Sequence, residues 1–483
     1  MPIRRKPMKN DYNYTILTDF YEITMANGYF QSNIKDSEAV FDMFFREIPD
    51  DGGFAIMAGV DQLIEYLDNL HFSDEDIEYL RSKGCFCEEF LEYLRNFEFK
   101  CDVWAVPEGT PIFPNEPIVT VKGPLIQAQF VETMILLTIN HQSLIATKAN
   151  RIVRAAQGRP VMEFGTRRAQ GTAAAVMGAR AAYIGGCIGT ACAIADRDYD
   201  VKALGTMAHS WIQSFDTEYE AFYEYARLYP DNATLLIDTY NVLDSGLPNA
   251  IKVFKELKPA KMGVRIDSGD ITYLTKKTRE ILDANGLTDC AIVISNSLDE
   301  FIIREVLLEG AQIDSFGVGE RLITAKSDPV FGGVYKLAGI ERDGKLVPKM
   351  KISENVGKIT NPGFKKVYRF YGADHGKAMA DLIALSDEPM PSGETFEIFD
   401  PNATWKRKKL YNFEVRELLV PIFEKGKCVY KSPSIDEIRQ YCKDQIGTLW
   451  NEALRFENPP IYKVDLSQKL YDLKNEILNK HSK

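Results

Sequence analysis

Short apolar runs return at a regular spacing in the middle of this chain, and each run ends in a polar or glycine residue. The runs TLLID (234–238), GVRID (263–267) and AIVISN (291–296) end 29 residues apart. Similar runs are VMEFG (161–165), DSFGVG (314–319) and the segment before GTMAHS (205–210). A period of about 30 residues is typical of a repeating β-strand–helix unit, in which successive strands are parallel. The pattern therefore predicts an α/β fold that contains an irregular parallel β/α barrel.

The segments on either side of this region follow different patterns. Before it lie a helix that Thr18 caps, a strand at 38–47, helices within 60–97 and a β-meander at 103–123. After it come a lysine-rich loop and strand, and then helical patterns. We therefore expect three parts: an additional α+β domain at 1–140, the β/α barrel at 141–340 and a C-terminal segment at 341–483 that packs on both.

Charge and composition exclude several classes of protein. The chain has 58 Lys and Arg against 69 Asp and Glu, a net charge of −11, which argues against a general nucleic-acid binder. No stretch approaches the length of a membrane span, and no apolar segment follows the basic start MPIRRKPMKN as a secretory signal would require. The eight cysteines are scattered and show neither a disulfide nor a zinc-site spacing. A reduced, cytoplasmic protein without a protein-bound metal cluster is expected.

Polar residues gather where the predicted strands end. In a parallel barrel these ends meet at one rim, which carries the catalytic groups. The rim residues are Glu163, Arg167, His209, Asp238, Arg265, Asp267, Asn296, Gly317 and Gly319. Acids, arginines, a histidine and glycines on one rim indicate a site for an anionic substrate.

Each of these residue types has a chemical reason to be there. Arginine forks at 167 and 265 hold phosphate or carboxylate groups bidentately. His209 is a competent nucleophile toward phosphorus, and Asp238 is placed to fix its tautomer. Asp267 suits ribose hydroxyls or Mg²⁺. Backbone N–H groups of the glycine pairs 317/319 and 332/333 suit a phosphate.

The segments TDFYEITMANGYF, EFGTRRAQG, GTMAHSW, LLIDTYN, VRIDSGD, SNSLDE, FGVGERL, GGVYKL and KITNPG occur in this order between about residues 18 and 363. In sequence and order they resemble nicotinate phosphoribosyltransferases, whose barrel is of the type II phosphoribosyltransferase kind. The last ~120 residues carry little that matches this pattern.

The resemblance implies an ATP-dependent enzyme of NAD biosynthesis, of the ligase class. Such an enzyme makes nicotinate mononucleotide and diphosphate from nicotinate and 5-phosphoribosyl 1-diphosphate, with Mg²⁺ and a transient phosphohistidine. Carried onto this chain, the catalytic residues are His209, Asp238 and Asp267. Tyr21, Thr206 and Arg265 resemble nicotinate contacts, and Phe164 resembles the second face of an aromatic sandwich with Tyr21. Arg167 resembles an anion-binding residue, Thr360 a diphosphate-substrate contact, and Gly317, Gly319, Gly332 and Gly333 a 5-phosphate site. A homodimer is implied, in which Tyr21 reaches the other subunit's site.

Two other enzymes remain as alternatives. A nicotinamide phosphoribosyltransferase would share the barrel and the histidine, but it would need an acid facing the amide, and an arginine favours nicotinate instead. A phosphosugar lyase or isomerase on a β/α barrel would share the glycine pairs and would use a Schiff-base lysine or an acid/base pair. A binding protein derived from the enzyme should have lost His209 or Asp238, and both are present.

Overall fold

The computed structural model describes residues 13–481 and divides them into two compact units. One is the continuous segment Ile145–Pro329, and the other combines the chain up to Leu144 with the chain from Val330 onward. Among residues 13–481, none of the helices combines the length and the apolar character that a membrane span needs. The segment MPIRRKPMKN, where we expect no secretory signal, lies outside the described residues.

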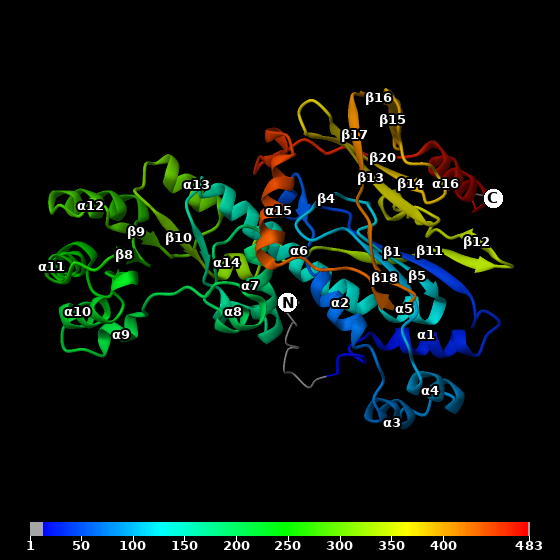
Figure 1. Cartoon of the computed structure of the whole chain (residues 1–483), viewed down its shortest axis with the longest axis horizontal. Coiled ribbons are helices and arrows are strands. Elements are labelled where there is room, and N and C mark those ends of the chain that lie inside the picture. Colours follow the sequence, from blue (N-terminus) through cyan, green and yellow to red (C-terminus); the bar gives the residue numbers. More distant parts are fainter. Residues whose placement is uncertain (1–12, 482–483) are drawn as a thin grey trace. The chain divides into compact units, whose positions relative to one another are not determined.

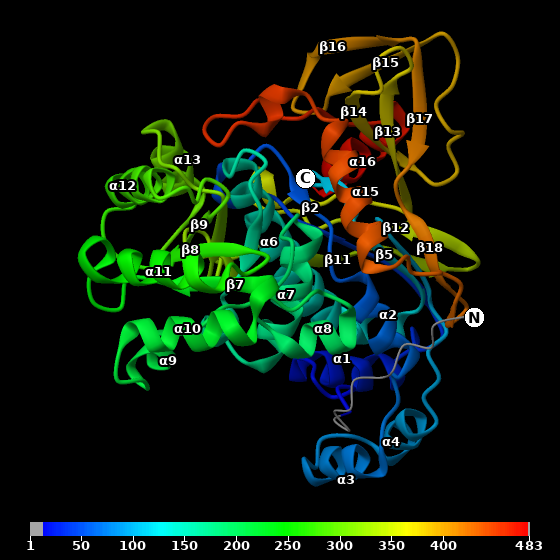
Figure 2. The same ribbon diagram turned by 60° about the vertical axis from the view of Figure 1, so that its left-hand side comes forward.

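The continuous unit is built on a parallel sheet. Its strands are β6 (Val161–Glu163), β7 (Ala233–Leu236), β8 (Met262–Ile266), β9 (Ala291–Ile294) and β10 (Ser315–Val318), in the order β6-β10-β9-β8-β7. The helices between them lie outside the strands, as the green ribbons of Figures 1 and 2 show. They are α10 (Glu218–Leu228), α11 (Leu247–Leu257), α12 (Ile271–Ala284) and α13 (Glu300–Leu308). The predicted α/β fold with parallel strands is confirmed.

The edge of this sheet beyond β6 is irregular. Isolated parallel bridges join Glu163 to Thr190 and Thr190 to Ala203, so the strand expected before Gly205 is reduced to a single bridge. Farther along, the Asn232 side chain donates a hydrogen bond to the Gly205 carbonyl oxygen at 3.2 Å. Through these contacts the segment that follows β6 extends from the β6 side of the sheet toward the β7 side. Complete closure of the sheet into a barrel stays a prediction. The unit's remaining helices are α7 (Thr172–Ile184), α8 (Ala193–Tyr199), α9 (His209–Gln213) and α14 (Glu320–Ile323).

The other unit is centred on a seven-stranded antiparallel sheet with the order β12-β11-β1-β5-β3-β18-β19. The strands from the chain's first part are β1 (Glu38–Phe44), β3 (Asp102–Ala105) and β5 (Val119–Pro124). Those from its last part are β11 (Val334–Arg342), β12 (Lys345–Pro348), β18 (Val420–Glu424) and β19 (Lys427–Cys428). β11 pairs with β1, and β18 pairs with β3. The expected boundary at residue 340 therefore falls inside a strand of this sheet, because the first and last parts of the chain share it.

Helices and smaller sheets complete this unit. Its helices are α1 (Phe20–Phe30), α2 (Val60–Asp68), α3 (Asp74–Ser82), α4 (Glu88–Arg95), α5 (Leu125–Phe130), α15 (Ile435–Gly447) and α16 (Gln468–His481), and α6 (Glu132–Ala155) begins in it. A four-stranded sheet contains β13 (Lys365–Gly372), β14 (Ala378–Leu385), β17 (Phe413–Glu417) and β20 (Val464–Leu466). Two smaller sheets each have two strands: β15 (Thr395–Asp400) with β16 (Ala403–Tyr411), and β2 (Ala55–Ile56) with β4 (Pro111–Ile112). The expectation that Thr18 caps the first helix is wrong, because its hydroxyl bonds to the Glu22 side chain and Asp19 precedes the helix.

Candidate active site

The register of the parallel sheet decides which side chains meet at its carboxyl end. Leu236 pairs with Arg265, and Arg265 pairs with Val293, so the next inward positions along the strands are Asp238, Asp267 and Ser295. These three side chains are linked. The Asp267 N–H donates to Asp238 Oδ2 at 3.0 Å, and the Ser295 hydroxyl donates to Asp267 Oδ1 at 2.5 Å. The sheet therefore holds the carboxyl groups of Asp238 and Asp267 side by side at the carboxyl ends of its strands.

His209, the first residue of α9, faces these two carboxyl groups. Its Nε2 lies 3.9 Å from Asp238 Oδ1 and 3.8 Å from Asp267 Oδ2, and its Nδ1 is 3.1 Å from the Thr239 hydroxyl. The Asp238 side chain is 2% exposed, and its Oδ1 has no hydrogen-bond partner. The sequence expectation paired His209 with Asp238, and the structure brings Asp267 equally close.

Arg265 supplies positive charge beside the carboxyl groups. Its Nη1 donates a hydrogen bond to the Thr206 hydroxyl, whereas its Nε is buried and has no partner. Burial lowers the pKa of Arg265, and repulsion by Arg167 acts in the same direction, while Asp267 and Asp238 oppose it. A buried guanidinium N–H without an acceptor is costly, so this position is suited to a ligand that brings an oxygen.

Phe164 and Gly317 fit against each other on the inner face of the sheet. A Cβ added at Gly317 would lie 2.4 Å from Phe164 Cδ2 and 3.3 Å from Ser295 Cβ. Gly317 is buried within β10 rather than following it, and the Phe164 ring fills the space that a side chain would need. Position 317 must therefore be a glycine so that the Phe164 ring can pack against it. Contact of Gly317 and Gly319 with a phosphate stays a prediction.

Replacing Gly317 with alanine should displace the Phe164 ring. We expect the free energy of unfolding to fall by about 1–3 kcal/mol, because the added methyl group overfills a closed space. Denaturant unfolding of the purified protein measures this loss. Gly205→Ala is the matched control, since nothing lies within 4 Å of a Cβ at Gly205 and its stability should stay within ~0.5 kcal/mol. Equal stability of the two variants would contradict the packing role.

The segment after β6 places its acid and its arginines differently. Glu163 is buried and accepts hydrogen bonds from the Gly165 N–H and, at 2.6 Å, from the Thr190 hydroxyl. These two hydrogen bonds make Glu163 an internal support for the turn, and burial raises the pKa of its carboxyl group. Arg167 and Arg168 are exposed, and Arg168 Nε is 4.0 Å from Glu320 Oε2. Both arginines remain accessible to an anion.

The remaining predicted site residues belong to the other compact unit. They are Tyr21, Gly332, Gly333 and Thr360. Tyr21 is 45% exposed on α1. Gly333 donates its N–H to the Asn140 side chain at 3.1 Å, whereas Gly332 has open space around it and a φ of +71°. The amide of Gly333 is therefore already engaged within the protein.

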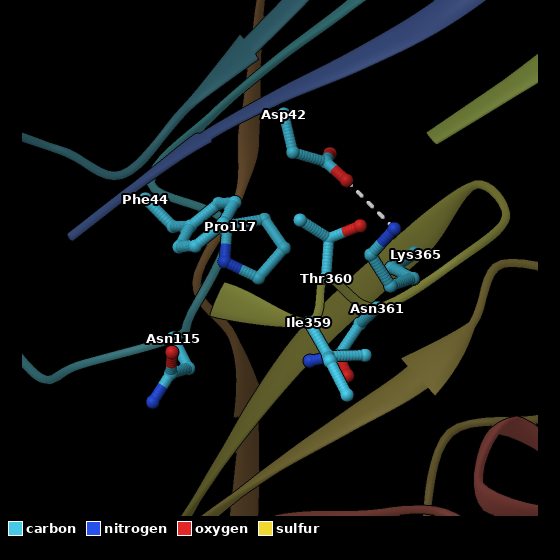
Figure 3. A pocket seen from close by; sticks show the side chains of 8 residues that line it. All are labelled: Asp42, Phe44, Asn115, Pro117, Ile359, Thr360, Asn361 and Lys365. Carbon is cyan, nitrogen blue, oxygen red and sulfur yellow. Dashed lines mark ion pairs between the residues drawn. The ribbon is translucent and has the colours of Figure 1, made fainter. Parts of the chain in front are cut away.

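Thr360 lines a small pocket of this second unit (Figure 3). Beside it, Lys365 Nζ lies 2.6 Å from Asp42 Oδ2, and both side chains are buried. The Thr360 hydroxyl accepts the Lys351 N–H at 3.1 Å. The pocket's lining is completed by Phe44, Asn115, Pro117, Ile359 and Asn361. The charge of Lys365 is already balanced by Asp42, so this lysine adds little attraction for a diphosphate. Contact of Thr360 with a diphosphate stays a prediction.

Sequence reasoning missed three hydroxyl groups of the first unit's site. Thr239 contacts His209, Ser268 donates to Asp238 Oδ2, and Ser295 donates to Asp267. We selected Asn296 at the end of the AIVISN run, but the inward position is Ser295, two residues beyond Val293. The run itself gives no sign of this, because the register of the neighbouring strands decides which residue faces inward.

Comparison with known proteins assigns the chain to a family. Three family profiles match: the nicotinate phosphoribosyltransferase N-terminal domain at residues 16–140, the nicotinate phosphoribosyltransferase family at 160–369 and its C-terminal domain at 364–474. The third match extends the resemblance into the C-terminal region that we could not match from the sequence.

Individual relatives cover nearly the whole chain. The nicotinate phosphoribosyltransferase of Bacillus subtilis is 42% identical over 97% of both chains, and one from Mycobacterium tuberculosis is 40% identical over 92% of this chain and 89% of its own. The crystal structure of human nicotinic acid phosphoribosyltransferase superposes with a TM-score of 0.84, at 28% identity, over 96% of this chain and 100% of that one. The chain belongs to the nicotinate phosphoribosyltransferase family.

Proposed function

We propose that this protein transfers the 5-phosphoribosyl group of 5-phosphoribosyl 1-diphosphate to nicotinate, forming nicotinate mononucleotide and diphosphate in NAD biosynthesis. The observation that carries this proposal is Arg265, whose buried Nε lacks an acceptor beside the Thr206 hydroxyl. The nicotinate carboxylate supplies the missing acceptor and a compensating charge. Nicotinamide offers a carbonyl oxygen but no charge, and its amide N–H₂ would need an acceptor of its own.

The chemistry requires little proton transfer. The pyridine nitrogen attacks C1 of the ribose with a lone pair that carries no proton, while the bond to the diphosphate oxygen breaks. The site must therefore orient the ring and stabilise the positive charge that develops on the ribose. Phe164 offers one aromatic face for the ring, and Tyr21 of a second copy of the chain is proposed to offer the other. Asp267 and Asp238 supply negative charge at the same edge of the sheet.

We assign to His209 the role of accepting a phosphoryl group from ATP. Its Nε2 faces two carboxyl groups, which favour a proton on that nitrogen, so the lone pair is on Nδ1, where it accepts a hydrogen bond from Thr239. Nδ1 would attack the terminal phosphorus of ATP, with ADP as the leaving group. The phosphorylated ring adds close to two negative charges beside Arg265 and the carboxyl groups, enough to change substrate affinity in the coupled reaction.

Mg²⁺ fits this site through the chemistry of its donors. The orphaned Asp238 Oδ1 and the neighbouring Asp267 carboxyl group are hard oxygen ligands of the kind that Mg²⁺ prefers. Among the described residues, no group of three or more metal-ligating side chains surrounds one point. The ion would thus be held by one or two carboxylates together with phosphate oxygens. When bound, it neutralises charge on the departing diphosphate.

A homodimer in the cytoplasm completes the proposal. Four apolar or aromatic side chains of α1 and the turn before it are exposed: Leu17, Phe20, Tyr21 and Met25. A second copy of the chain would cover this surface and receive Tyr21 in its own site. The eight cysteines are scattered along the chain without the spacing of a disulfide framework, which supports a reducing compartment.

Side-by-side assays of nicotinate and nicotinamide, each with and without ATP, test the proposed activity. We expect product from nicotinate, stimulation of this reaction by ATP and little product from nicotinamide. Efficient use of nicotinamide would instead favour a nicotinamide phosphoribosyltransferase. Cleavage of a phosphosugar through an imine that borohydride traps on a lysine would indicate the lyase alternative.

A further inference from the structure

Glu22 is a fully buried carboxyl group at the start of α1, next in sequence to Tyr21. It is the third residue of the helix, and its exposed fraction is 0%. The Thr133 hydroxyl donates to Glu22 Oε1 at 2.5 Å, and the Thr18 hydroxyl donates to Glu22 Oε2. Both oxygens of the carboxyl group therefore accept hydrogen bonds from threonine side chains, one just before α1 and one on α6.

Thr133 makes Glu22 part of a connection between two helices. Its hydroxyl accepts the backbone N–H of Asp19 at 3.1 Å while it donates to Glu22. Asp19 is the residue before α1, and its own side chain makes no cap hydrogen bond, so Thr133 holds the start of the helix through the Asp19 backbone. Thr133 is the second residue of α6. The hydrogen bonds from Asp19 to Thr133 and from Thr133 to Glu22 thus fasten the first turn of α1 to the first turn of α6.

Glu132, beside Thr133, approaches the Tyr21 hydroxyl. Its Oε2 accepts a hydrogen bond from Gln129 at 2.7 Å, and its Oε1 is 3.8 Å from Lys336 Nζ. Partial burial raises the pKa of Tyr21, and the charge and hydrogen bonding of Glu132 raise it further. Tyr21 is thus held at its backbone by the connected first turns, and the Glu132 carboxyl group at the same end of α6 raises the pKa of its hydroxyl.

We propose that Glu22 is a positioning residue for Tyr21: by joining the first turns of α1 and α6, it fixes where the tyrosine ring stands to receive the pyridine ring. This inference rests on the proposed contact of Tyr21 with nicotinate. Glu22 touches no substrate, and it acts only through the helix that carries Tyr21.

The connection depends on the charge of Glu22. The titratable groups around it are Asp19, Glu132, Tyr66, Tyr335 and Tyr21, and Lys336 Nζ lies 3.8 Å from Glu132 Oε1. Burial raises the pKa of Glu22 to about 7, although the hydrogen bonds from Thr133 and Thr18 oppose the rise. The ionised carboxylate accepts both hydroxyl protons, whereas the protonated acid must donate one proton itself and reverse one of these bonds. The positioning therefore strengthens as the pH rises through about 7.

Glu22→Gln tests the inference, because the amide has one acceptor and one donor group at every pH. We expect the KM for nicotinate to rise ~3- to 10-fold above pH 7.5, since a hydrogen bond to an ionised group is lost. kcat and the KM for the phosphoribosyl donor should change less than twofold. The ratio of variant to wild-type KM should shrink toward one between pH 8 and pH 6, a comparison from which substrate ionisation cancels.

Thr133→Val provides a second route that does not alter the carboxyl group. It removes the hydroxyl between Asp19 and Glu22, and it should raise the KM for nicotinate in the same direction. The double variant should be no worse than the poorer single variant, because both changes break one connection. Asp68→Asn, at the end of α2, is the control: burial raises the pKa of Asp68 as well, but its replacement should leave the KM at every pH unchanged.

The outcomes separate this inference from the proposed function. If Tyr21→Ala leaves the KM for nicotinate unchanged, the proposed contact of Tyr21 fails. If Tyr21→Ala raises this KM but Glu22→Gln and Thr133→Val do not, the contact stands and the positioning role of Glu22 is overturned. A uniform loss of kcat in both variants, with no pH-dependent change in KM, would also overturn it.

Discussion

Replacing Arg265 with glutamine should lower kcat/KM for nicotinate by about ten- to a hundredfold. The guanidinium group has a buried Nε without a partner, and a charge-assisted contact there is worth ~1.5–3 kcal/mol. Nicotinamide has no carboxylate to pair with Arg265, so kcat/KM for nicotinamide should change much less. The ratio of the two kcat/KM values therefore narrows, and steady-state assays with both substrates measure it.

Two further variants interpret the Arg265 result. Arg265→Lys keeps the charge but removes the planar fork, so it should also weaken the use of nicotinate. Arg227→Gln is the surface control, because Arg227 is exposed on α10 and its Nη2 pairs with Glu224 Oε2 at 2.7 Å, and we expect less than a twofold effect. An equal loss for nicotinate and nicotinamide in Arg265→Gln would assign Arg265 to the ribose or the diphosphate and move carboxylate selection to Arg167 or Arg168.

Incubation with γ-labelled ATP should give a phosphoprotein that is labile in acid and stable in base, and the label should be absent from His209→Ala. The chain has five histidines, and His209 is the one predicted at the rim of the parallel sheet. ATP should no longer stimulate this variant, while basal transfer should persist because that chemistry does not need the imidazole. Label that remains in His209→Ala would place the phosphoryl group on another residue.

The structure also predicts which ring nitrogen carries the phosphoryl group. The carboxyl groups at Nε2 and the hydroxyl at Nδ1 assign the attack to Nδ1, so hydrolysed, labelled protein should contain the Nδ1 isomer of phosphohistidine. The Nε2 isomer would contradict the tautomer that we assign. In that case the carboxyl groups would be repelling the phosphoryl group rather than orienting the imidazole.

The periodic part of the sequence predicted its structure well, because a physical rule links the two. Parallel strands end at one edge, so runs 29 residues apart brought Asp238 and Asp267 into contact with the same histidine. The choice between Ser295 and Asn296 needed the register of neighbouring strands, which depends on partners far away in the chain. Glu22 was invisible for a related reason: an acid in an amphipathic helix normally faces water, and its burial depends on Thr133, 111 residues later.

The C-terminal region illustrates a different limit. The sequence predicts a lysine-rich loop and strand there, followed by helical patterns, and α15 and α16 match those patterns, whereas strands β14 to β18 are not predicted. Strand β16 reads ATWKRKKLY, with four consecutive cations, and the side chains from Trp405 to Lys409 are all exposed, whereas Ala403 and Leu410 are buried. Such a sequence lacks the alternation that marks a half-buried strand. Its pairing with β15 is stabilised by tertiary packing of Ile398 and Leu410, which no local pattern shows.

The shared antiparallel sheet has a consequence for synthesis of the chain. When a ribosome has completed the first 144 residues, the segments that form β1, β5 and β3 have been synthesised. The strands that pair with the outer edges of this three-stranded sheet, β11 and β18, have not. The edge of β1 waits for β11, and the edge of β3 waits until Val420 of β18 has emerged. The intervening unit is continuous and can fold in the meantime. Unpaired strand edges attract other strands, so the nascent chain is most prone to aggregate during this interval.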